Sequence, residues 1–243
     1  MNILGIIPAR YASTRFPGKP LVDIAGKSMI QRVYEQSKKC ALLNDVIVAT
    51  DDERIYDHVI AFGGKVVMTS PDHQSGTDRS AEVSAKNPEY DIIINIQGDE
   101  PYINPEQISK VALCFDASDT QIATLVKKIQ TDQELFNPNS PKVILNKNSE
   151  AIYFSRSPLP HIRGHEQQDW LLHFIYFKHI GIYGYRADVL QQITKLPVSS
   201  LEKAESLEQL RWVENGYRIK VTETELETYA IDTPEDLNRL SEL

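Results

Sequence analysis

The stretch MNILGIIPARYASTRFPGKPL, residues 1–21, joins a short apolar run to a basic loop. The run, Ile3–Ile7, contains no polar residue, which is typical of a parallel strand buried on both faces of a sheet. The loop follows it directly and carries Arg10, Arg15 and Lys19 but no acidic residue. Because ligands of open α/β sheets bind beyond the carboxyl ends of the strands, this loop is the first candidate for a binding site.

The same pattern of apolar runs and helical segments continues along the first half of the chain. Further runs lie at Val46–Ala49, Val66–Met68 and Ile92–Ile96. Repeated strand–helix units predict an α/β fold with right-handed crossovers. The second half is less regular, with strands expected at Ile122–Val126, Lys142–Leu145 and Ile152–Phe154. Leu201–Val213 is expected to form one helix, and 158–169 a polar surface loop. No linker or repeat divides the chain, so we expect a single domain over residues 1–243.

Composition narrows the classes of function. The net charge of −8 over 243 residues offers no basic field for a nucleic acid. The apolar runs are too short to span a bilayer, and the N-terminus lacks the basic region of a signal peptide. Cys40 and Cys114 fall in predicted helices and suggest neither disulfides nor metal ligation, which favours a reducing, cytoplasmic location. A basic loop on an acidic protein indicates a small polyanion as ligand.

The residues of the basic loop suit phosphate binding. Arginine grips phosphate oxygens in a bidentate way, and lysine supplies a mobile positive charge. Transfer of a phosphoryl or nucleotidyl group depends mainly on positioning and on neutralising charge, so the loop fits a nucleoside triphosphate. A solvated basic loop is the alternative. The known glycine motifs are absent, because Leu21 replaces the first glycine of a P-loop ending at Gly26-Lys27-Ser28 and no Gly-x-Gly-x-x-Gly occurs.

Two aspartates are candidate metal ligands. Asp99 ends the segment IQGD after the predicted strand Ile92–Ile96, and Gly98 before it allows close backbone approach. Magnesium usually takes one or two protein carboxylates together with phosphate oxygens and water. Asp232, in the segment IDTPEDL, is the candidate for the second carboxylate. The alternatives are a turn residue at Asp99 and a residue favoured by the helix dipole at Asp232.

Other candidates are individually weaker. Arg79 lies in the first turn of a predicted helix, where the dipole disfavours a cation, so it needs a partner. The candidate partners are a base carbonyl, a phosphate, or an ordinary salt bridge to Asp78 or Glu82.

Five residues of the second half are candidates for a sugar or carboxylate site. They are Arg156, His179, Tyr183, Glu208 and Gln209. Arginine clamps carboxylates, and the acidic and amide groups accept hydrogen bonds from sugar hydroxyls. A structural histidine and a solvated acidic helix face are the alternatives.

Nine blocks, in order along essentially the whole chain, carry a family resemblance. They are PARYASTRFPGKPL (8–21), VATDDERI (48–55), DHQSGTDR (72–79), NIQGDEP (95–101), FNPNSPKV (136–143), YFSR (153–156), HIGIYGYRA (179–187), LEKAESLEQLR (201–211) and IDTPEDL (231–237). The chain resembles the CMP-KDO synthetases, or 3-deoxy-manno-octulosonate (KDO) cytidylyltransferases. The first, third and fourth blocks are the most specific.

The resemblance implies a nucleotide-diphospho-sugar transferase fold, with a mixed, largely parallel sheet flanked by helices. A smaller sugar-binding and dimerisation lobe is expected within roughly 130–215, giving a homodimer. The implied reaction joins CTP and KDO to form a CMP-sugar and pyrophosphate for lipopolysaccharide biosynthesis, with Mg²⁺ as cofactor. The segments 158–169 and 223–230 depart from the family pattern, so an analogue such as 8-amino-KDO is an alternative substrate.

The resemblance also assigns roles to individual residues. It implies a CTP site of Ala9, Arg10, Ser13, Arg15, Lys19, Arg79, Gln97, Gly98 and Asp99. The implied catalytic residues are Lys19, Arg10 and Asp99 of this site, together with Asp232. The implied sugar site contains Gln97, Arg156, His179, Tyr183, Glu208 and Gln209. The implied metal ligands are Asp99 and Asp232.

Four other functions compete with this interpretation. A nucleotidyltransferase for a sugar 1-phosphate would want a second basic cluster, of which only Arg156 is present. A glycosyltransferase of similar fold would usually carry Asp-x-Asp, which this chain lacks. A nucleotidyltransferase for another sugar acid and a non-catalytic nucleotide-sugar sensor are the remaining alternatives.

Overall fold

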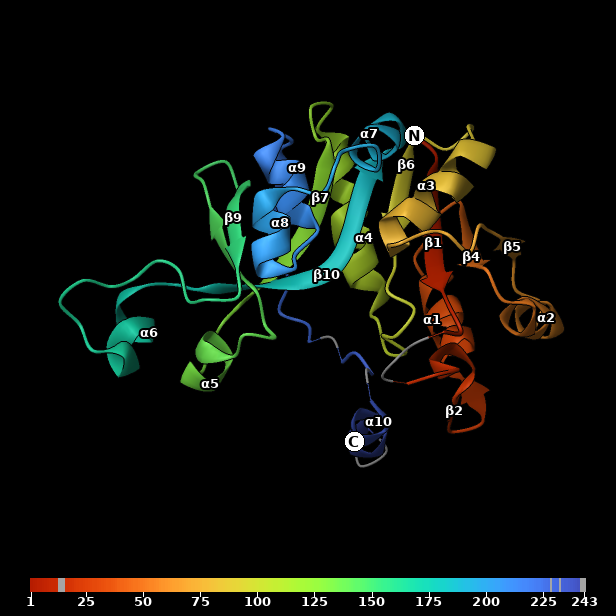
Figure 1. Ribbon diagram of the computed structural model, residues 1–243, viewed down its shortest axis with the longest axis horizontal. Helices are drawn as coiled ribbons and strands as arrows, with labels where there is room; N and C mark the ends of the chain where they lie inside the picture. The colour runs from red at the N-terminus through yellow and green to blue at the C-terminus, as the bar shows by residue number, and fades with distance from the viewer. Residues whose placement is uncertain (13–15, 228, 232, 241–243) are drawn as a thin grey trace.

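The computed structural model describes residues 1–12, 16–227, 229–231 and 233–240 (Figure 1). Within them a nine-stranded sheet has the strand order β11-β7-β10-β6-β1-β4-β5, with β8 and β9 attached beside β10. The strands are β1 (Ile3–Ala9), β4 (Asp45–Thr50), β5 (Val66–Met68), β6 (Ile92–Asn95), β7 (Ile122–Lys128), β8 (Lys142–Leu145), β9 (Ala151–Ser155), β10 (Phe177–Arg186) and β11 (Ile219–Glu223). A separate hairpin joins β2 (Asp23–Ile24) to β3 (Lys27–Ser28).

Helices cover both faces of the sheet. They are α1 (Met29–Ser37), α2 (Glu53–Ala61), α3 (Gly76–Lys86), α4 (Pro105–Leu113), α5 (Asp132–Phe136), α6 (Trp170–His173), α7 (Ala187–Ile193), α8 (Ser200–Glu205), α9 (Gln209–Glu214) and α10 (Pro234–Leu240). Short 3₁₀ turns lie at η1 (Lys19–Leu21), η2 (Cys114–Asp116) and η3 (Gln167–Asp169). Within the described ranges, each helix is too short or too polar to cross a bilayer.

The sheet confirms the expected mixed, largely parallel architecture. Strand β1 runs parallel to β4 and β6, while β10 runs antiparallel to β6, β7 and β8. The buried apolar run of β1 alternates between two cores. Ile3 and Ile7 pack in the core of α1, α2 and α4, whereas Leu4 and Ile6 pack in the core of α3, α7 and α9. The predicted two-sided burial of this strand is therefore confirmed.

The prediction of one helix over Leu201–Val213 is wrong. Ser206 adopts a left-handed conformation with φ 51° and separates α8 from α9. The break lets the chain bury Leu207, and it sends the acidic side chains in different directions. Glu205 accepts a hydrogen bond from Ser155 at 2.7 Å, whereas Glu208 accepts one from Thr77 at 2.7 Å. A continuous helix would have held these two carboxylates on one face.

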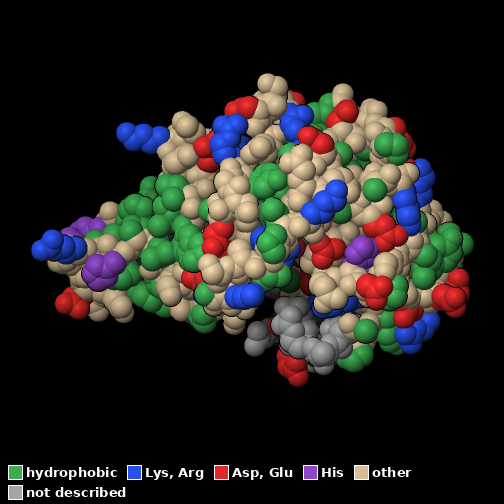
Figure 2. All heavy atoms as spheres, turned by 45° about the horizontal axis from the view of Figure 1, so that its top comes forward, with side chains coloured by type: hydrophobic (Ala, Val, Ile, Leu, Met, Phe, Trp, Pro, Cys, Tyr) green, Lys and Arg blue, Asp and Glu red, His purple; other side chains and the backbone are tan. Residues whose placement is uncertain are grey.

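Residues 157–176 extend from the body as an arm that carries η3 and α6 (Figure 1). The inner side of the arm is held by a small core that includes Trp170 and Tyr176. Its outer side leaves large apolar groups exposed, with Leu172 80% exposed and Ile175 54% exposed. The surface view shows hydrophobic side chains gathered over this arm (Figure 2). The predicted polar loop 158–169 forms only part of this projection.

Candidate functional site

A cavity of about 390 Å³ opens at the carboxyl ends of β1 and β6, between the basic loop and the start of α3. Its lining is Pro8, Ala9, Arg10, Lys19, Pro20, His73, Gln74, Ser75, Gly76, Thr77, Arg79, Asn95, Gln97, Gly98, Asp99, Tyr183 and Glu208. This is the edge of the sheet at which the sequence predicts a ligand. The lining includes the described members of the predicted CTP site, and from the predicted sugar site it includes Gln97, Tyr183 and Glu208.

Lys19 and Asp99 meet in the cavity although they are eighty positions apart in the sequence. The Lys19 Nζ lies 2.8 Å from Asp99 Oδ2. Gly98 makes this approach possible, because a Cβ at that position would lie 2.7 Å from the carbonyl oxygen of Pro8. Lys19 begins η1 directly after Gly18, which has φ 73°. Two glycines thus bring a strong cation and a carboxylate to one point at the sheet edge.

The C-terminal segment of the chain reaches the same point. The backbone N–H of Ile231 donates to the carbonyl oxygen of Asp99 at 2.9 Å. The Ile231 side chain is buried against Ile24 and Met29. The chain is thereby anchored beside Asp99 one residue before Asp232. Asp232 itself lies outside the described residues, as do Ser13 and Arg15 of the basic loop.

The residues present are compatible with a hard divalent cation. Among the described residues, no group of three or more His, Cys, Asp or Glu is placed to hold a metal ion. Asp99 nevertheless supplies a carboxylate oxygen that lines the cavity, and magnesium needs only one or two such ligands when phosphate oxygens complete its shell. The donor chemistry of this site therefore fits Mg²⁺ bound together with a nucleotide.

Glu100, which follows Asp99, is buried and 5% exposed. Burial, and to a lesser extent the charge of Asp99, raise the pKa of Glu100 to about 8. Its carboxyl group is accordingly mostly protonated at pH 7. The site thus gains no second negative charge from this neighbour.

The rest of the cavity lining is rich in hydrogen-bonding groups. Among the described residues, the buried atoms Asn95 Oδ1 and Tyr183 OH have no hydrogen-bond partner. Burial raises the pKa of Glu208, while the hydroxyl of Thr77 donates to its carboxylate at 2.7 Å. Gln97 Nε2 donates to the carbonyl of Gly181 at 2.8 Å. Gln97 and Glu208 are only partly buried, so their polar groups suit this part of the lining to a polyhydroxy ligand.

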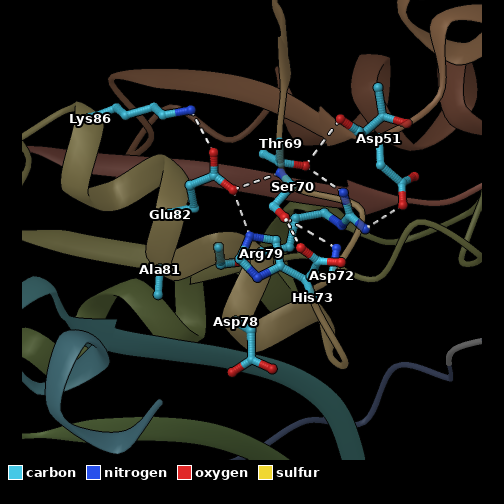
Figure 3. A network of polar contacts seen from close by, with 12 residues as sticks. Asp51, Thr69, Ser70, Asp72, His73, Asp78, Arg79, Ala81, Glu82 and Lys86 are labelled. Atoms are coloured by element: carbon cyan, nitrogen blue, oxygen red, sulfur yellow. Dashed lines mark hydrogen bonds and ion pairs between the residues drawn. The ribbon is translucent and has the colours of Figure 1, made fainter. Parts of the chain in front are cut away.

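Arg79 has protein partners in this structure. Arg79 is 3% exposed, and its Nη2 lies 3.0 Å from Asp51 Oδ2 (Figure 3). A second hydrogen bond runs from Nη1 to the hydroxyl of Thr69. The sequence left open an ion pair of Arg79 with Asp78 or Glu82. In the structure its ion-pair partner is Asp51. Arg79 also lines the cavity, so it joins the end of β4 to the wall of the site.

Three residues of the predicted sugar site do not line the cavity. Arg156 donates from Nε to the carbonyl of Glu205 at 2.7 Å and from Nη1 to the carbonyl of Pro138 at 2.9 Å. Gln209 is buried at the start of α9. His179 packs behind Tyr183, with 5.1 Å between the ring centroids. Their roles toward a sugar stay predictions, although His179 supports the ring of a cavity residue.

His179 is uncharged at neutral pH. Burial lowers the pKa of its imidazole to about 3. Its Nε2 lies 3.1 Å from the hydroxyl of Thr124, and Phe154 packs edge-on against the ring at 5.4 Å. A neutral ring in this place can donate or accept a hydrogen bond but cannot neutralise an anion.

Comparison with known proteins places the chain in a family. The Cytidylyltransferase family profile matches residues 4–221. A 3-deoxy-manno-octulosonate cytidylyltransferase of Parabacteroides distasonis is 63% identical over 244 residues, which span 98% of this chain and 96% of the relative. The chain belongs to the 3-deoxy-manno-octulosonate cytidylyltransferases. A member of this family from Bacteroides thetaiotaomicron is 59% identical over 246 residues, spanning 100% of this chain and 98% of the relative.

Solved structures agree with this family assignment. A CMP:2-keto-3-deoxy-manno-octonic acid synthetase complexed with CTP matches with a TM-score of 0.93 and 45% identity over 100% of both chains. The 4-diphosphocytidyl-2C-methyl-D-erythritol synthase of Anaerococcus prevotii matches with a TM-score of 0.62 at 12% identity, covering 98% of this chain and 95% of that one. The second likeness shows the fold alone. The predicted nucleotidyltransferase fold is confirmed.

Several lining residues of this cytidylyltransferase were missed by sequence reasoning. They are Pro8, Pro20, His73, Gln74, Ser75, Gly76, Thr77 and Asn95. A signal was available for His73, Gln74 and Ser75, because residues 69–75 follow β5 and so must lie at the same edge of the sheet as the basic loop. Asn95 was missed because the predicted strand Ile92–Ile96 placed it inside an apolar run, whereas it is the last residue of β6.

Replacing His179 with glutamine should reduce the dependence of stability on pH. The folded-state pKa of about 3 lies below the ordinary value of 6.5, so between these values the unfolded chain binds more protons. The stability that the neutral His179 ring contributes is therefore fully present above pH 6.5, and it is lost as the pH falls from 6.5 toward about 3. We expect the wild-type-minus-variant difference in unfolding free energy to drop by on the order of 2 kcal/mol from pH 7 to pH 5. Urea denaturation at both pH values measures it, and an unchanged difference would contradict the burial argument.

Proposed function

We propose that this chain transfers CMP from CTP to 3-deoxy-manno-octulosonate and releases pyrophosphate, a reaction of lipopolysaccharide biosynthesis. The observation that carries the proposal is one cavity whose lining combines two kinds of groups. The charged groups of Arg10, Lys19 and Asp99 occur there together with the hydrogen-bonding groups of Tyr183 and Glu208. A relative with 45% identity has been solved in complex with CTP, which supports the nucleotide assignment.

The residues of the cavity account for the chemistry. The sugar acid and the triphosphate are both anions, so the protein must neutralise charge to bring them together. Arg10 and Lys19 would bind the triphosphate and stabilise the departing pyrophosphate. The anomeric hydroxyl of the sugar would attack the α-phosphorus in line, without a covalent enzyme intermediate. Gln97 and Glu208 would orient the sugar hydroxyls, and the clamp on its carboxylate stays predicted for Arg156.

We propose Mg²⁺ as the cofactor, held by Asp99 and Asp232. Asp99 lines the cavity, and the hydrogen bond from Ile231 brings the chain to Asp99 directly before Asp232. Such an ion would neutralise phosphate charge and lower the pKa of the attacking hydroxyl. Asp99 already pairs with Lys19, so the lysine orients the carboxylate before substrate arrives.

The proposed substrates can be tested by pyrophosphate release from CTP with a panel of acceptors. The panel contains KDO, 8-amino-KDO, other sugar acids and a sugar 1-phosphate. We expect turnover with KDO or its amino analogue and none with the sugar 1-phosphate, because the described lining offers no second basic cluster for a phosphate. Release with the sugar 1-phosphate alone, or CTP binding without any release, would instead support the rival transferase or the sensor.

Asp99→Asn should abolish turnover while leaving CTP binding measurable. The substitution removes the carboxylate charge at the cavity, and losing one such electrostatic contact typically costs ~10²–10³ in rate. Steady-state pyrophosphate release and calorimetric titration with CTP measure the two effects. Asp116→Asn, at an exposed position on η2, is the matched control and should keep full activity. Near-wild-type turnover of Asp99→Asn would remove this residue from the mechanism.

We propose that the chain forms a homodimer through the lobe at roughly 130–215 and that the arm lies in the interface. The arm exposes Leu172, Phe174 and Ile175, and apolar groups gathered on one projection are typical of an interaction surface. A second copy is the occupant that the family resemblance implies. We also propose a cytoplasmic location, since Cys40 and Cys114 are free thiols.

Leu172→Asp should therefore weaken the dimer. A charge buried in an apolar interface without a partner is strongly unfavourable. Light scattering after size-exclusion chromatography should report the mass of one chain for the variant and of two chains for the wild type. Leu113→Asp is the matched control, because Leu113 is 53% exposed on α4 in the body of the protein. A Leu172→Asp variant with unchanged mass would exclude the arm from the interface.

A further inference from the structure

The loop between β5 and α3, residues 69–75, forms one wall of the cavity. His73 and Gln74 of this loop line the cavity together with the first turn of α3. The imidazole Nε2 of His73 lies 2.6 Å from Glu82 Oε2, on α3 (Figure 3). Glu82 is absent from the described lining, so it acts on the site from outside.

The carboxylate of Glu82 binds the loop at two places. It accepts the backbone N–H of Ser70 at 2.9 Å in addition to the His73 ring, and Lys86 Nζ lies 2.6 Å from its other oxygen. Burial disfavours its charge, but hydrogen bonds from Lys86, Ser70 and His73 outweigh that effect and lower the pKa of Glu82 to about 2. Glu82 is consequently a pure acceptor at neutral pH, and the His73 Nε2 must carry the hydrogen.

This hydrogen bond sets both the orientation and the tautomer of the His73 ring. With Nε2 donating to Glu82, Nδ1 is left for a ligand, and it has no hydrogen-bond partner among the described residues. The His73 side chain is 21% exposed, which leaves part of the ring accessible from the cavity. In proteins, a carboxylate bonded to one ring nitrogen of a histidine commonly fixes the tautomer in which the other nitrogen binds its ligand.

The strand order indicates which part of the substrate pair reaches His73. Tyr183 lies on β10, the basic loop follows β1, and His73 follows β5 at the far side of the sheet order. With the sugar acid at the β10 end and the phosphates on the basic loop, the nucleoside is left with the β5 end. His73, Gln74 and Arg79 line the cavity there.

We propose that His73 contacts the nucleoside of CTP and that Glu82 is the positioning residue that holds the His73 ring in place. The inference rests on the proposed function, because it requires CTP in this cavity.

The test is calorimetric binding of CTP and of CMP to the full-length protein and its variants. CMP shares the nucleoside but lacks the outer phosphates. His73→Ala should weaken both nucleotides equally, by about fivefold, which corresponds to one net hydrogen bond. Glu82→Ala should weaken both by a similar or smaller factor, and Glu82→Gln, which keeps an acceptor oxygen for the ring, should recover most of the affinity. The double variant His73→Ala/Glu82→Ala should bind no more weakly than His73→Ala.

Lys86→Met is the matched control. It removes another partner of Glu82, half exposed at the surface, without touching His73. We expect CTP affinity within twofold of wild type for this control, and an unchanged KM for the sugar acid in every variant. Thermal unfolding of each variant verifies that the fold is retained.

Each other outcome has a defined meaning. Wild-type protein that binds no CTP would overturn the proposed function itself. If the wild type binds CTP and His73→Ala binds it equally well, only the present inference fails. A loss confined to CTP would place His73 on the outer phosphates and overturn the nucleoside assignment. A further loss in the double variant would show that Glu82 holds the loop through Ser70, which overturns its role through His73.

Discussion

The ion pair between Lys19 and Asp99 is the contact on which the geometry of the cavity depends. It joins the loop after β1 to the turn after β6, two neighbouring parallel strands whose carboxyl ends define the site. The pair forms only because Gly98 lets the turn pass close to the carbonyl of Pro8. Ile231 then binds the backbone of Asp99, so the C-terminal segment is arranged around the same pair. Three distant parts of the chain thus converge on one charge contact.

The management of charge around this pair is as important as the pair itself. A site for the two proposed anionic substrates needs positive charge, and the proposed Mg²⁺ would also need a carboxylate. Burial holds Glu100 largely protonated next to Asp99 and raises the pKa of Glu208, which also lines the cavity. Arg79, in contrast, is committed to Asp51 and contributes little free charge to the lining. Among the described residues of the lining, Arg10 is the arginine or lysine that has no ion pair with a carboxylate, and phosphates would bind there.

The sequence predicted the sheet and one half of the site well, for a physical reason. Buried parallel strands and the loops at their carboxyl ends are local patterns, so β1, β6, Lys19 and Asp99 were all found from residue order alone. The break at Ser206 was missed because the helical periodicity of its flanks is good and the cause of the break is tertiary. It follows from burying Leu207 and directing Glu208 to Thr77.

The position of a side chain in a crowded site was equally inaccessible from sequence. Arg156 does close a strand as predicted, but its guanidinium is directed to carbonyl groups near α8, which only the packing of that helix reveals. His73 was passed over because histidine in a polar loop has no characteristic pattern. The proposed role of His73 depends on its hydrogen bond with Glu82, which lies nine residues later in α3 and which the sequence does not reveal.

Strand β10 has a consequence that reaches beyond the cavity. It begins at Phe177, where the arm returns to the body, and it carries Tyr183 at the rim of the site. Strand β7 pairs with it along Phe177–Ile180, the register shifts between Ile180 and Tyr183, and pairing with β6 begins only at Tyr183. A displacement of the arm would therefore reach the tyrosine through the irregular part of one strand. The arm and the wall of the cavity share a single backbone segment, and its weakest stretch lies between them.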